Sequence, residues 1–484
     1  MHPAQPPAHD DGPPPNLDRR TFLGGTTALA IGGAHLGLTA ASYAQVQGAN
    51  ERIGVGFLGY GLIGRRHVLD FRQQPDVHLV GLAEAHSGRL EGGRGLLGRQ
   101  AKGYGDFREL LDNRDVDAVV VSTPDHWHAL QTMMACAAGK DVYVEKPLTL
   151  FAREGRWMIE VAKQHHSVVQ VGTQQRSGKH YQKARELIQG GHIGKVVSVR
   201  MHAYRNIMPG FGSPPDGPPP SELNYDLWLG PAPKRPYNPH RAIYHFRWFW
   251  DYSGGQLTNL GQHSLDVVDW ILGPLQARSV VSTGGRFALQ DNGETPDVQD
   301  ALFQFDGWSA AWSHRECARG EPARFGLVFV GTKGSLGISR NGFSVIPDPE
   351  VSPESEVPSL GTGHPRGGPA PPVVKESAKA NPTGASRTQP LEDRSGDSMA
   401  QFRDHVRDFL DCVKSRKSPV SNLESGHRVA ALCHLANTSL RLGRSLRWDA
   451  QREEIVNDSE ANACLSRPYR APWNRELRAL GVEG

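Results

Sequence analysis

The chain of 484 residues has little of what marks several protein classes. Its five cysteines are scattered and form no C-x-x-C pair, so the sequence indicates neither a disulfide framework nor a cysteine zinc site. The formal net charge is only +3, whereas proteins that bind phosphate backbones usually carry a strong basic excess in one patch. Past the N-terminus, no uninterrupted apolar stretch approaches the ~20 residues of a membrane-spanning helix. We therefore expect no nucleic-acid partner, and no membrane span in the mature chain.

Glycine and proline are abundant, with 55 and 35 residues respectively. Their excess gathers in the N-terminal leader, in a loop at residues 209–220 and in a segment at residues 347–398. That last segment is rich in Pro, Gly and Ser and almost free of aromatic residues, so we predict a flexible insertion there. The length suits two domains, since domains take roughly 100–200 residues each.

The N-terminus carries a basic pair, Arg19 and Arg20, followed by a small-residue apolar run at 24–41. A small-x-small site ends at Ala44. This pattern resembles a twin-arginine signal peptide over residues 1–44, and it predicts a periplasmic or otherwise exported protein. Because that route carries folded proteins, a cofactor could be loaded before export.

A dinucleotide-binding pattern follows the leader. An apolar run at residues 53–58 predicts a strand, a G-x-G-x-x-G sequence follows it, and a helical pattern begins at Arg65. In such a turn, Gly59 makes the tight bend, Gly61 lets a pyrophosphate approach the backbone, and Gly64 allows helix and strand to pack closely. The predicted cofactor-binding residues of the turn are Gly59, Gly61, Leu62, Ile63 and Gly64.

Glu84 ends the second predicted strand, twenty residues past Gly64. A carboxylate there accepts a hydrogen bond from the ribose 2′-hydroxyl and repels a 2′-phosphate, which favours NAD(H) over NADP(H). Arg89 lies close behind and keeps NADP(H) open as the less favoured cofactor.

Further β-branched runs at residues 117–121, 141–144 and 168–171 alternate with helical patterns. This alternation predicts a parallel sheet, and with the glycine motif it indicates a Rossmann domain over residues 51–172. Ligands of such sheets bind beyond the carboxyl ends of the strands. His126 and His128 lie in one of these loops, but no third residue with zinc-site spacing accompanies them, so we expect no metal site.

The motifs in this order resemble those of the Gfo/Idh/MocA oxidoreductases. After the glycine turn come T-P-x-x-x-H at residues 123–128, E-K-P at 145–147 and G-G-x₅-G-x-H-x-x-D at 254–266. The resemblance covers residues 52–272, and more loosely 399–473. It implies an α/β plus α+β fold, with the Rossmann domain followed by a mostly antiparallel open-sheet substrate domain over residues 173–346 and 399–484. It also implies a small carbohydrate substrate and a homo-oligomer, a dimer or tetramer built through the open sheets.

The resemblance also implies site residues. Lys146 and His263 correspond to the family's residues that face the reacting hydroxyl, and Asn259 stands where many members have an acid. We predict His263 as the general acid/base and Lys146 as its hydrogen-bonding and electrostatic partner, although either could be the base. The predicted cofactor contacts beyond the first two strands are Thr123, Pro124, His128, Glu145 and Lys146.

Substrate contacts are expected from two further places. Amide and guanidinium groups follow the last Rossmann strand, and aromatic residues precede the histidine motif; interdomain hydrogen bonds and core packing are the respective alternatives. The candidates are Gln174, Arg176, Arg247, Trp250 and Tyr252, together with Asn259 and His263.

Three functions are compatible with these residues. The first is an NAD(H)-dependent oxidoreductase that transfers hydride to or from a hydroxyl-bearing carbon of a sugar or glycoside, with tightly bound cofactor. The second is a redox-neutral glycosidase that oxidises C3 transiently, eliminates the aglycone, adds water and reduces the product. The third is a non-catalytic protein that binds sugar or cofactor, an alternative that rests on Asn259.

Overall fold

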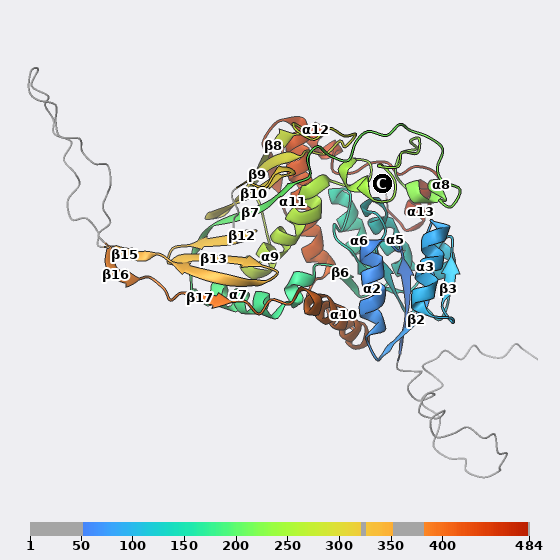
Figure 1. Ribbon diagram of the computed structural model, residues 1–484, viewed down its shortest axis with the longest axis horizontal. Coiled ribbons are helices and arrows are strands. Elements are labelled where there is room, and N and C mark those ends of the chain that lie inside the picture. The colour runs from blue at the N-terminus through green and yellow to red at the C-terminus, as the bar shows by residue number, and fades with distance from the viewer. Residues whose placement is uncertain (1–51, 321–325, 352–381, 483–484) are drawn as a thin grey trace, which may run out of the picture. The chain divides into compact units, whose positions relative to one another are not determined.

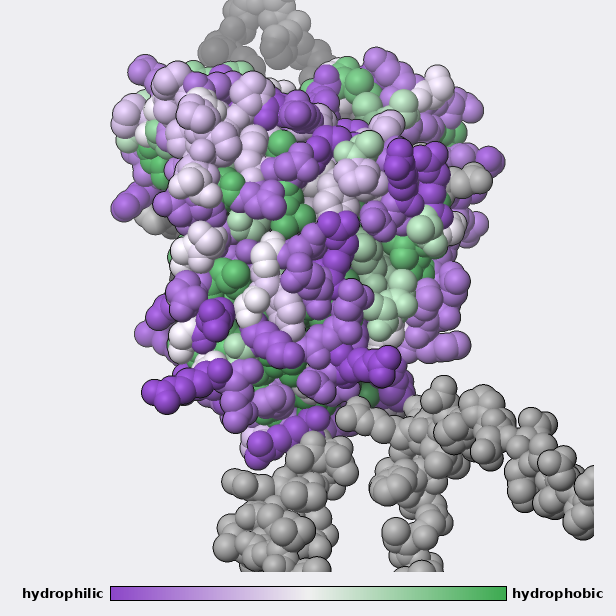
Figure 2. Space-filling view, turned by 90° about the vertical axis from the view of Figure 1, so that its right-hand side faces the viewer, coloured by the Kyte–Doolittle hydropathy of each residue, from purple (hydrophilic) through white to green (hydrophobic). Residues whose placement is uncertain are grey.

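The computed structural model describes residues 52–320, 326–351 and 382–482. The predicted signal peptide at residues 1–44 lies outside the described residues, as does most of the predicted insertion. Within the described ranges, no helix is both long and apolar enough to cross a membrane. The face seen in Figure 2 is mainly hydrophilic, with small and separate hydrophobic areas.

The N-terminal part is a six-stranded sheet in the order β3-β2-β1-β4-β5-β6, and all of its strand pairs are parallel (Figure 1). The order reverses direction between β1 and β4, which is the place where doubly wound sheets bind dinucleotides. The strands are β1 (Ile53–Leu58), β2 (Val77–Ala83), β3 (Lys102–Tyr104), β4 (Ala118–Val121), β5 (Asp141–Val144) and β6 (Val169–Val171). The helices between them are α2 (Leu62–Arg72), α3 (Ser87–Leu97), α4 (Phe107–Leu111), α5 (Asp125–Ala137) and α6 (Ala152–Gln164).

Both faces of this sheet are covered, partly by helices from the far end of the chain. On one face α5 and α6 share a core with α13 (Trp473–Ala479), where the rings of Trp127 and Trp473 lie 4.7 Å apart. On the other face α2 packs with α10 (Ser398–Ser415) through Phe71 and Phe409, whose centroids are 6.3 Å apart. The buried, β-branched strands therefore match a sheet shielded from water on both sides.

The second part is an eleven-stranded sheet, antiparallel except for the parallel pair β7 and β10. This confirms the predicted fold class. Its strands are β7 (Val196–Asn206), β8 (Ser279–Gly285), β9 (Val298–Phe305), β10 (Trp308–Arg315), β11 (Cys317–Ala318), β12 (Leu327–Gly331), β13 (Gly334–Ser339), β14 (Gly342–Pro347), β17 (Leu391–Asp393), β18 (Leu446–Asp449) and β19 (Glu454–Ile455).

One face of the second sheet is packed and the other is open. Trp312, Phe303 and Phe329 bury their side chains in a core shared with the helices. Those helices are α7 (Lys179–Gln189), α9 (Gln262–Leu272) and α11 (Leu423–Leu442), and α11 also contacts α6 of the Rossmann part (Figure 1). On the opposite face, Val281 and Leu302 pair across β8 and β9 and remain 41% and 56% exposed.

Part of the predicted flexible insertion forms strands in the structure. Within residues 347–398, β15 (Pro349–Val351) and β16 (Pro382–Ser386) pair with one another, and β17 extends the large sheet beside β14. The exposed edge of β14 offers backbone groups that β17 completes, which composition alone does not reveal. Residues 352–381 lie outside the described residues.

A long segment, residues 207–256, joins β7 to the helix that carries the histidine motif. Its short helices are α8 (Tyr225–Leu229) and η3 (His245–Trp248). Aromatic side chains such as Trp228, Phe246 and Tyr252 give it a small core of its own. We call it the covering segment, because it hydrogen-bonds to the Rossmann part: Ser87 N donates to Glu222 O at 2.8 Å and Asn224 N to Ala85 O at 2.9 Å. The remaining short helices are η2 (Gln174–Ser177), η4 (Leu257–Gly261) and α12 (Ser459–Ala463).

Candidate active site

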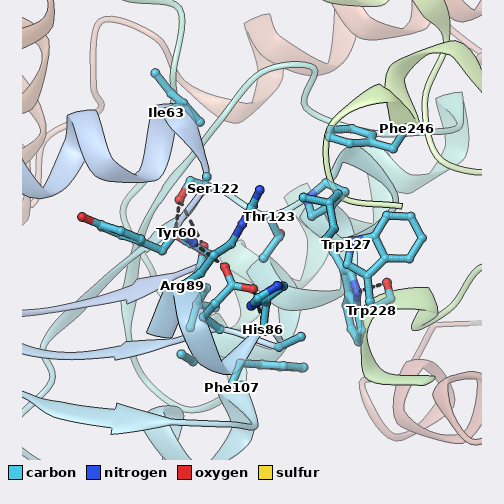
Figure 3. A pocket seen from close by; sticks show the side chains of 18 of the residues that line it. Tyr60, Ile63, His86, Arg89, Phe107, Ser122, Thr123, Trp127, Trp228 and Phe246 are labelled. Atoms are coloured by element: carbon cyan, nitrogen blue, oxygen red, sulfur yellow. Dashed lines mark hydrogen bonds between the residues drawn. The ribbon is translucent and has the colours of Figure 1, made fainter. Parts of the chain in front are cut away.

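A cavity of about 470 Å³ lies at the carboxyl ends of β1, β2, β4 and β5. The covering segment closes one side of it, and Figure 3 shows Trp228 and Phe246 across from Thr123. We call it the nucleotide cavity. It brings together most of the predicted cofactor residues: Gly59, Gly61, Leu62, Ile63, Glu84, Thr123, Pro124, His128, Glu145 and Lys146.

The glycine turn is shaped for a dinucleotide. Gly59 has φ +88°, a conformation that favours glycine. A Cβ on Gly64 would stand 2.4 Å from the carbonyl oxygen of Gly59, so this residue packs beneath the turn and does not line the cavity. A Cβ on Gly61 would meet only Arg89 Nη1, at 4.0 Å, so the backbone there faces open space. The first turn of α2 therefore presents free N–H groups to a space that fits a pyrophosphate.

Glu84 stands at the end of β2, as predicted, and fixes the turn. Its Oε2 accepts a hydrogen bond from Tyr60 N at 2.8 Å and its Oε1 accepts one from His86 N at 3.0 Å. His86 and Arg89 line the same side of the cavity (Figure 3). The carboxylate suits a ribose diol, while Arg89 supplies a cation that a 2′-phosphate would bind.

Lys146 follows β5 and is held by Asn259. Its Nζ donates to Asn259 O at 2.8 Å and to Asn259 Oδ1 at 3.0 Å. Asn259 lies in η4, a π-helical turn of the kind often found at functional sites. Burial, assisted by the charges of Arg247 and Arg340, lowers the pKa of Lys146 to about 8, although the carboxylates of Glu145 and Asp125 oppose this.

Glu145 is buried behind Lys146 in a hydrogen-bond network. Its Oε1 lies 2.7 Å from His67 Nε2 and accepts from Gln174 Nε2 at 2.9 Å, while its Oε2 accepts from Lys146 N at 3.1 Å. Burial alone would raise the pKa of Glu145, but the hydrogen bond with His67 and the nearby charges hold it below its ordinary value. Gln174 also donates to Tyr143 Oη, at 3.0 Å, so it supports Glu145 and lines neither cavity, away from the place predicted for a substrate contact.

His263 is the second residue of α9 and is 7% exposed. Its Nδ1 has no hydrogen-bond partner among the described residues, and its Nε2 lies 3.5 Å from Arg340 Nη2. Burial, with the charges of Lys146 and Arg340, places the pKa of His263 well below its usual range, which makes the imidazole neutral.

His263 lines a second cavity of about 290 Å³, which we call the sheet-side cavity. The two predicted catalytic residues thus line different cavities, joined through η4: Asn259 binds Lys146, and the next residue, Leu260, lines the sheet-side cavity. Strands β7, β10, β12 and β13 contribute its wall. Its polar lining residues are Gln175, Tyr181, His202, His263, Ser264, Ser339 and Arg340.

Three more residues predicted to contact substrate have other partners in the structure. Arg176 donates from Nε and Nη2 to Asp266 at 2.8 and 2.7 Å in a buried ion pair, so its guanidinium is already engaged. Tyr252 is fully buried between the rings of His126 and Trp228. Trp250 lies against the guanidinium of Arg441, 5.3 Å from its ring, and lines neither cavity. Of these aromatic-segment candidates, Arg247 does line the nucleotide cavity.

The two histidines of the T-P-x-x-x-H motif hydrogen-bond to backbone carbonyl groups of the surrounding loops. His128 places Nδ1 2.6 Å from Pro147 O and Nε2 2.8 Å from Thr123 O, which ties two cavity loops together. His126 Nε2 lies 2.9 Å from Trp228 O of the covering segment. In the described ranges, no cluster of three or more His, Cys, Asp or Glu side chains could hold a metal ion.

Some site residues were not predicted. His67 lies on α2, three residues past Gly64, and its position after the glycine motif was the one available signal. Arg340 lies between β13 and β14, far from every motif, and only the folded sheet brings it to His263.

Comparison with known proteins agrees with this architecture. The family described as "Oxidoreductase family, NAD-binding Rossmann fold" matches residues 53–173. Its companion, "Oxidoreductase family, C-terminal alpha/beta domain", matches residues 180–283 and 386–475, and the "GFO/IDH/MocA C-terminal domain" matches 234–337. The chain belongs to the Gfo/Idh/MocA oxidoreductase family. The predicted resemblance is therefore confirmed.

Among Gfo/Idh/MocA relatives, inositol 2-dehydrogenase of Salmonella paratyphi B is 28% identical over 162 residues, 33% of this chain and 48% of that protein. This chain thus matches about half the length of that curated relative. The scyllo-inositol 2-dehydrogenase (NAD(+)) of Bacillus subtilis is 27% identical over 285 residues, 58% of this chain and 71% of that protein.

Solved structures share the fold. A levoglucosan dehydrogenase in complex with NADH and levoglucosan superposes with a TM-score of 0.60 at 17% identity, covering 82% of this chain and 99% of that one. An NAD binding oxidoreductase from Klebsiella pneumoniae gives 0.59 at 20% identity, with 82% and 99% covered.

Proposed function

We propose that the protein is an NAD(H)-dependent oxidoreductase that acts on a hydroxyl group of a sugar or glycoside and keeps its cofactor bound between reactions. The observation that carries this proposal is Lys146, whose Nζ is fixed by Asn259 beside the nucleotide cavity. The curated relatives act on inositols, which are polyhydroxylated rings, and this supports a polyhydroxylated substrate.

The residues around Lys146 and His263 can move the hydroxyl proton. A bound nicotinamide supplies the hydride acceptor or donor. With a pKa of about 8, Lys146 is mostly protonated at neutral pH but keeps a neutral fraction of about a tenth, which suits a general acid/base. His263 has a much lower pKa and stays neutral, so it suits a hydrogen-bonding partner of the same hydroxyl. This reverses the roles first predicted for the two residues.

Asn259 replaces the family acid without disabling the lysine. Its two oxygens give Lys146 the acceptors that a carboxylate would give, but they add no negative charge. A carboxylate in contact would favour the protonated form of Lys146, whereas the amide adds no further negative charge to those of Glu145 and Asp125. Asn259 therefore supports catalysis and removes the main reason for a non-catalytic protein.

Retention of the cofactor is supported by the covering segment. Its hydrogen bonds to Ala85 and Ser87 lie next to Glu84, so it crosses the sheet edge on the side of the predicted ribose site. Leu223, Trp228 and Phe246 of this segment line the nucleotide cavity. The predicted export would take the protein away from the cytoplasmic NAD pool, and a cofactor reoxidised in place would then be required.

The proposed function is tested on the purified full-length protein. Denaturation followed by mass spectrometry is expected to release a nicotinamide dinucleotide, NAD rather than NADP, in near-stoichiometric amount. Adding sugars and glycosides to the native protein is then expected to change the near-ultraviolet absorbance of that bound nicotinamide. A preparation that neither releases nicotinamide nor reduces added NAD with any sugar would contradict the proposal; release of an aglycone with loss of C2 deuterium would instead establish the glycosidase.

We also propose that the open face of the second sheet joins two subunits. Val281 and Leu302 are cross-strand neighbours that expose apolar side chains there. Leu302→Arg would place charge inside such an interface and is expected to convert the protein to monomers in sedimentation experiments. Gln100→Arg, in an exposed loop of the Rossmann part, is the charge-matched control and should leave the assembly intact. A monomeric wild type would show that there is no such interface. An oligomer unchanged by Leu302→Arg would show that the subunits contact one another elsewhere.

A further inference from the structure

Each of the two cavities has an arginine near Lys146 among its lining residues. Among the described residues, no carboxylate forms an ion pair with either of these two arginines. Arg247 lines the nucleotide cavity, with its guanidinium carbon 4.6 Å from the centroid of Phe246 and Nη1 donating to Tyr244 O at 3.2 Å. Arg340 lines the sheet-side cavity, with Nη2 3.5 Å from His263 Nε2. Both positive charges act on Lys146, against the negative charges of Glu145 and Asp125.

The nearby carboxylates are already used by other partners. Asp125 accepts a hydrogen bond from Ser253 Oγ, and Glu145 is bound by His67 and Gln174. Elsewhere in the described structure, buried arginines have acidic partners, as Arg176 has with Asp266. By contrast, Arg340 is exposed and Arg247 is half-buried, so each guanidinium is free to pair with a ligand that brings negative charge.

The sheet-side cavity also offers partners for a polyhydroxylated molecule. The Tyr181 hydroxyl accepts from Gln175 Nε2 at 3.0 Å, while the buried Gln175 Oε1 and His263 Nδ1 have no partner among the described residues. Ser264 adds a hydroxyl and Trp312 an apolar surface. A sugar carbon held near Lys146 and His263 could therefore extend its substituents into this cavity.

We propose that the substrate is an acidic sugar, a hexuronic acid or a related sugar acid, whose carboxylate is bound by Arg340. A planar guanidinium binds a planar carboxylate through two parallel hydrogen bonds. The sheet-side cavity has one guanidinium, that of Arg340, without an acidic partner among the described residues, which matches a ligand with one negative charge. A phosphate carries about two negative charges, which the one guanidinium of Arg340 would balance only in part. Arg340 is then the residue that selects the substrate, while Lys146 and His263 face the hydroxyl that reacts.

This inference rests on the proposed function and is tested on the full-length protein with its nucleotide. D-glucuronate and D-galacturonate are compared with D-glucose, D-galactose and D-glucose 6-phosphate, by kcat and KM for reduction of the nicotinamide and by calorimetric Kd. The wild type is expected to prefer the uronates. Arg340→Met is expected to raise KM and Kd for the uronates about 10–100-fold, as for loss of a charged hydrogen bond, and to change KM and Kd for the neutral sugars much less.

Arg340→Lys should restore part of the uronate affinity, because charge remains while the paired geometry is lost. Arg99→Met, in an exposed loop outside both cavities, is the control and should match the wild type. Equal use of neutral and acidic sugars, or a uronate KM unmoved by Arg340→Met, overturns the inference and leaves the proposed function standing. A preference for the hexose phosphate that Arg340→Met removes also overturns it, in favour of a phosphate site. If no sugar is turned over, the proposed function fails, and calorimetry alone decides whether Arg340 binds uronates.

Discussion

Lys146→Met is expected to lower kcat for the substrate about 10²–10⁴-fold, the usual contribution of a general acid/base. Methionine keeps a similar length and apolar stem but can neither donate to Asn259 nor exchange a proton with a substrate hydroxyl. Because Lys146 is only one of many residues lining the nucleotide cavity, the bound nucleotide should remain. Single-turnover reduction of the bound nicotinamide, measured on protein whose nucleotide content is checked by mass spectrometry, provides the test.

The pH dependence of the wild type belongs to the same prediction. Oxidation of an alcohol needs Lys146 unprotonated, so the rate should rise with pH through about 8, the pKa of its ammonium group. His263→Ala is the comparison variant: it should reduce the rate while keeping this pH dependence, because the imidazole is neutral throughout. A Lys146→Met protein that keeps its rate, with a His263→Ala protein that loses it, would assign the proton transfer to His263.

Local sequence patterns predicted a set of nucleotide-binding residues that the fold brings together at one cavity. The glycine turn, Glu84 and the strand ends are set by short-range rules that leave signals in the sequence, and these residues line one cavity. Helix α3 was not predicted, because its eleven residues include four glycines. The fold explains one of them: a Cβ on Gly93 would stand 2.1 Å from Leu82 Cδ2, so glycine allows α3 to pack on β2.

The substrate half could not be predicted to the same degree, because long-range contacts decide which polar groups are free. Arg176 and Arg340 are indistinguishable in a sequence. In the fold, Arg176 forms an ion pair with Asp266. The guanidinium of Arg340 lies beside His263 and has no acidic partner among the described residues. The aromatic run before the histidine motif likewise divides between the core of the covering segment and the cavity wall, according to packing that composition does not encode.

The amide at Asn259 has a measurable consequence for the lysine. Asn259 Oδ1 lies 3.0 Å from Lys146 Nζ. Aspartate at this position would bring a negative charge into contact with the ammonium group and stabilise its protonated form. Opposite charges this close usually shift a pKa by about 1–3 units, upward in the case of a lysine.

Asn259→Asp is therefore expected to move the alkaline rise of the oxidation rate upward by about 1–3 pH units, which lowers the rate at neutral pH about 10–1000-fold. At a pH above the new pKa the rate should recover, because the geometry of the lysine is preserved. Asn259→Ala is the matched control: it removes the side-chain acceptor without adding charge, so it should lower the rate without raising the apparent pKa. The test is to compare the pH profiles of kcat for the wild type, Asn259→Asp and Asn259→Ala. An Asn259→Asp profile that coincides with the wild type would mean that Lys146 is not the group whose ionisation governs the reaction.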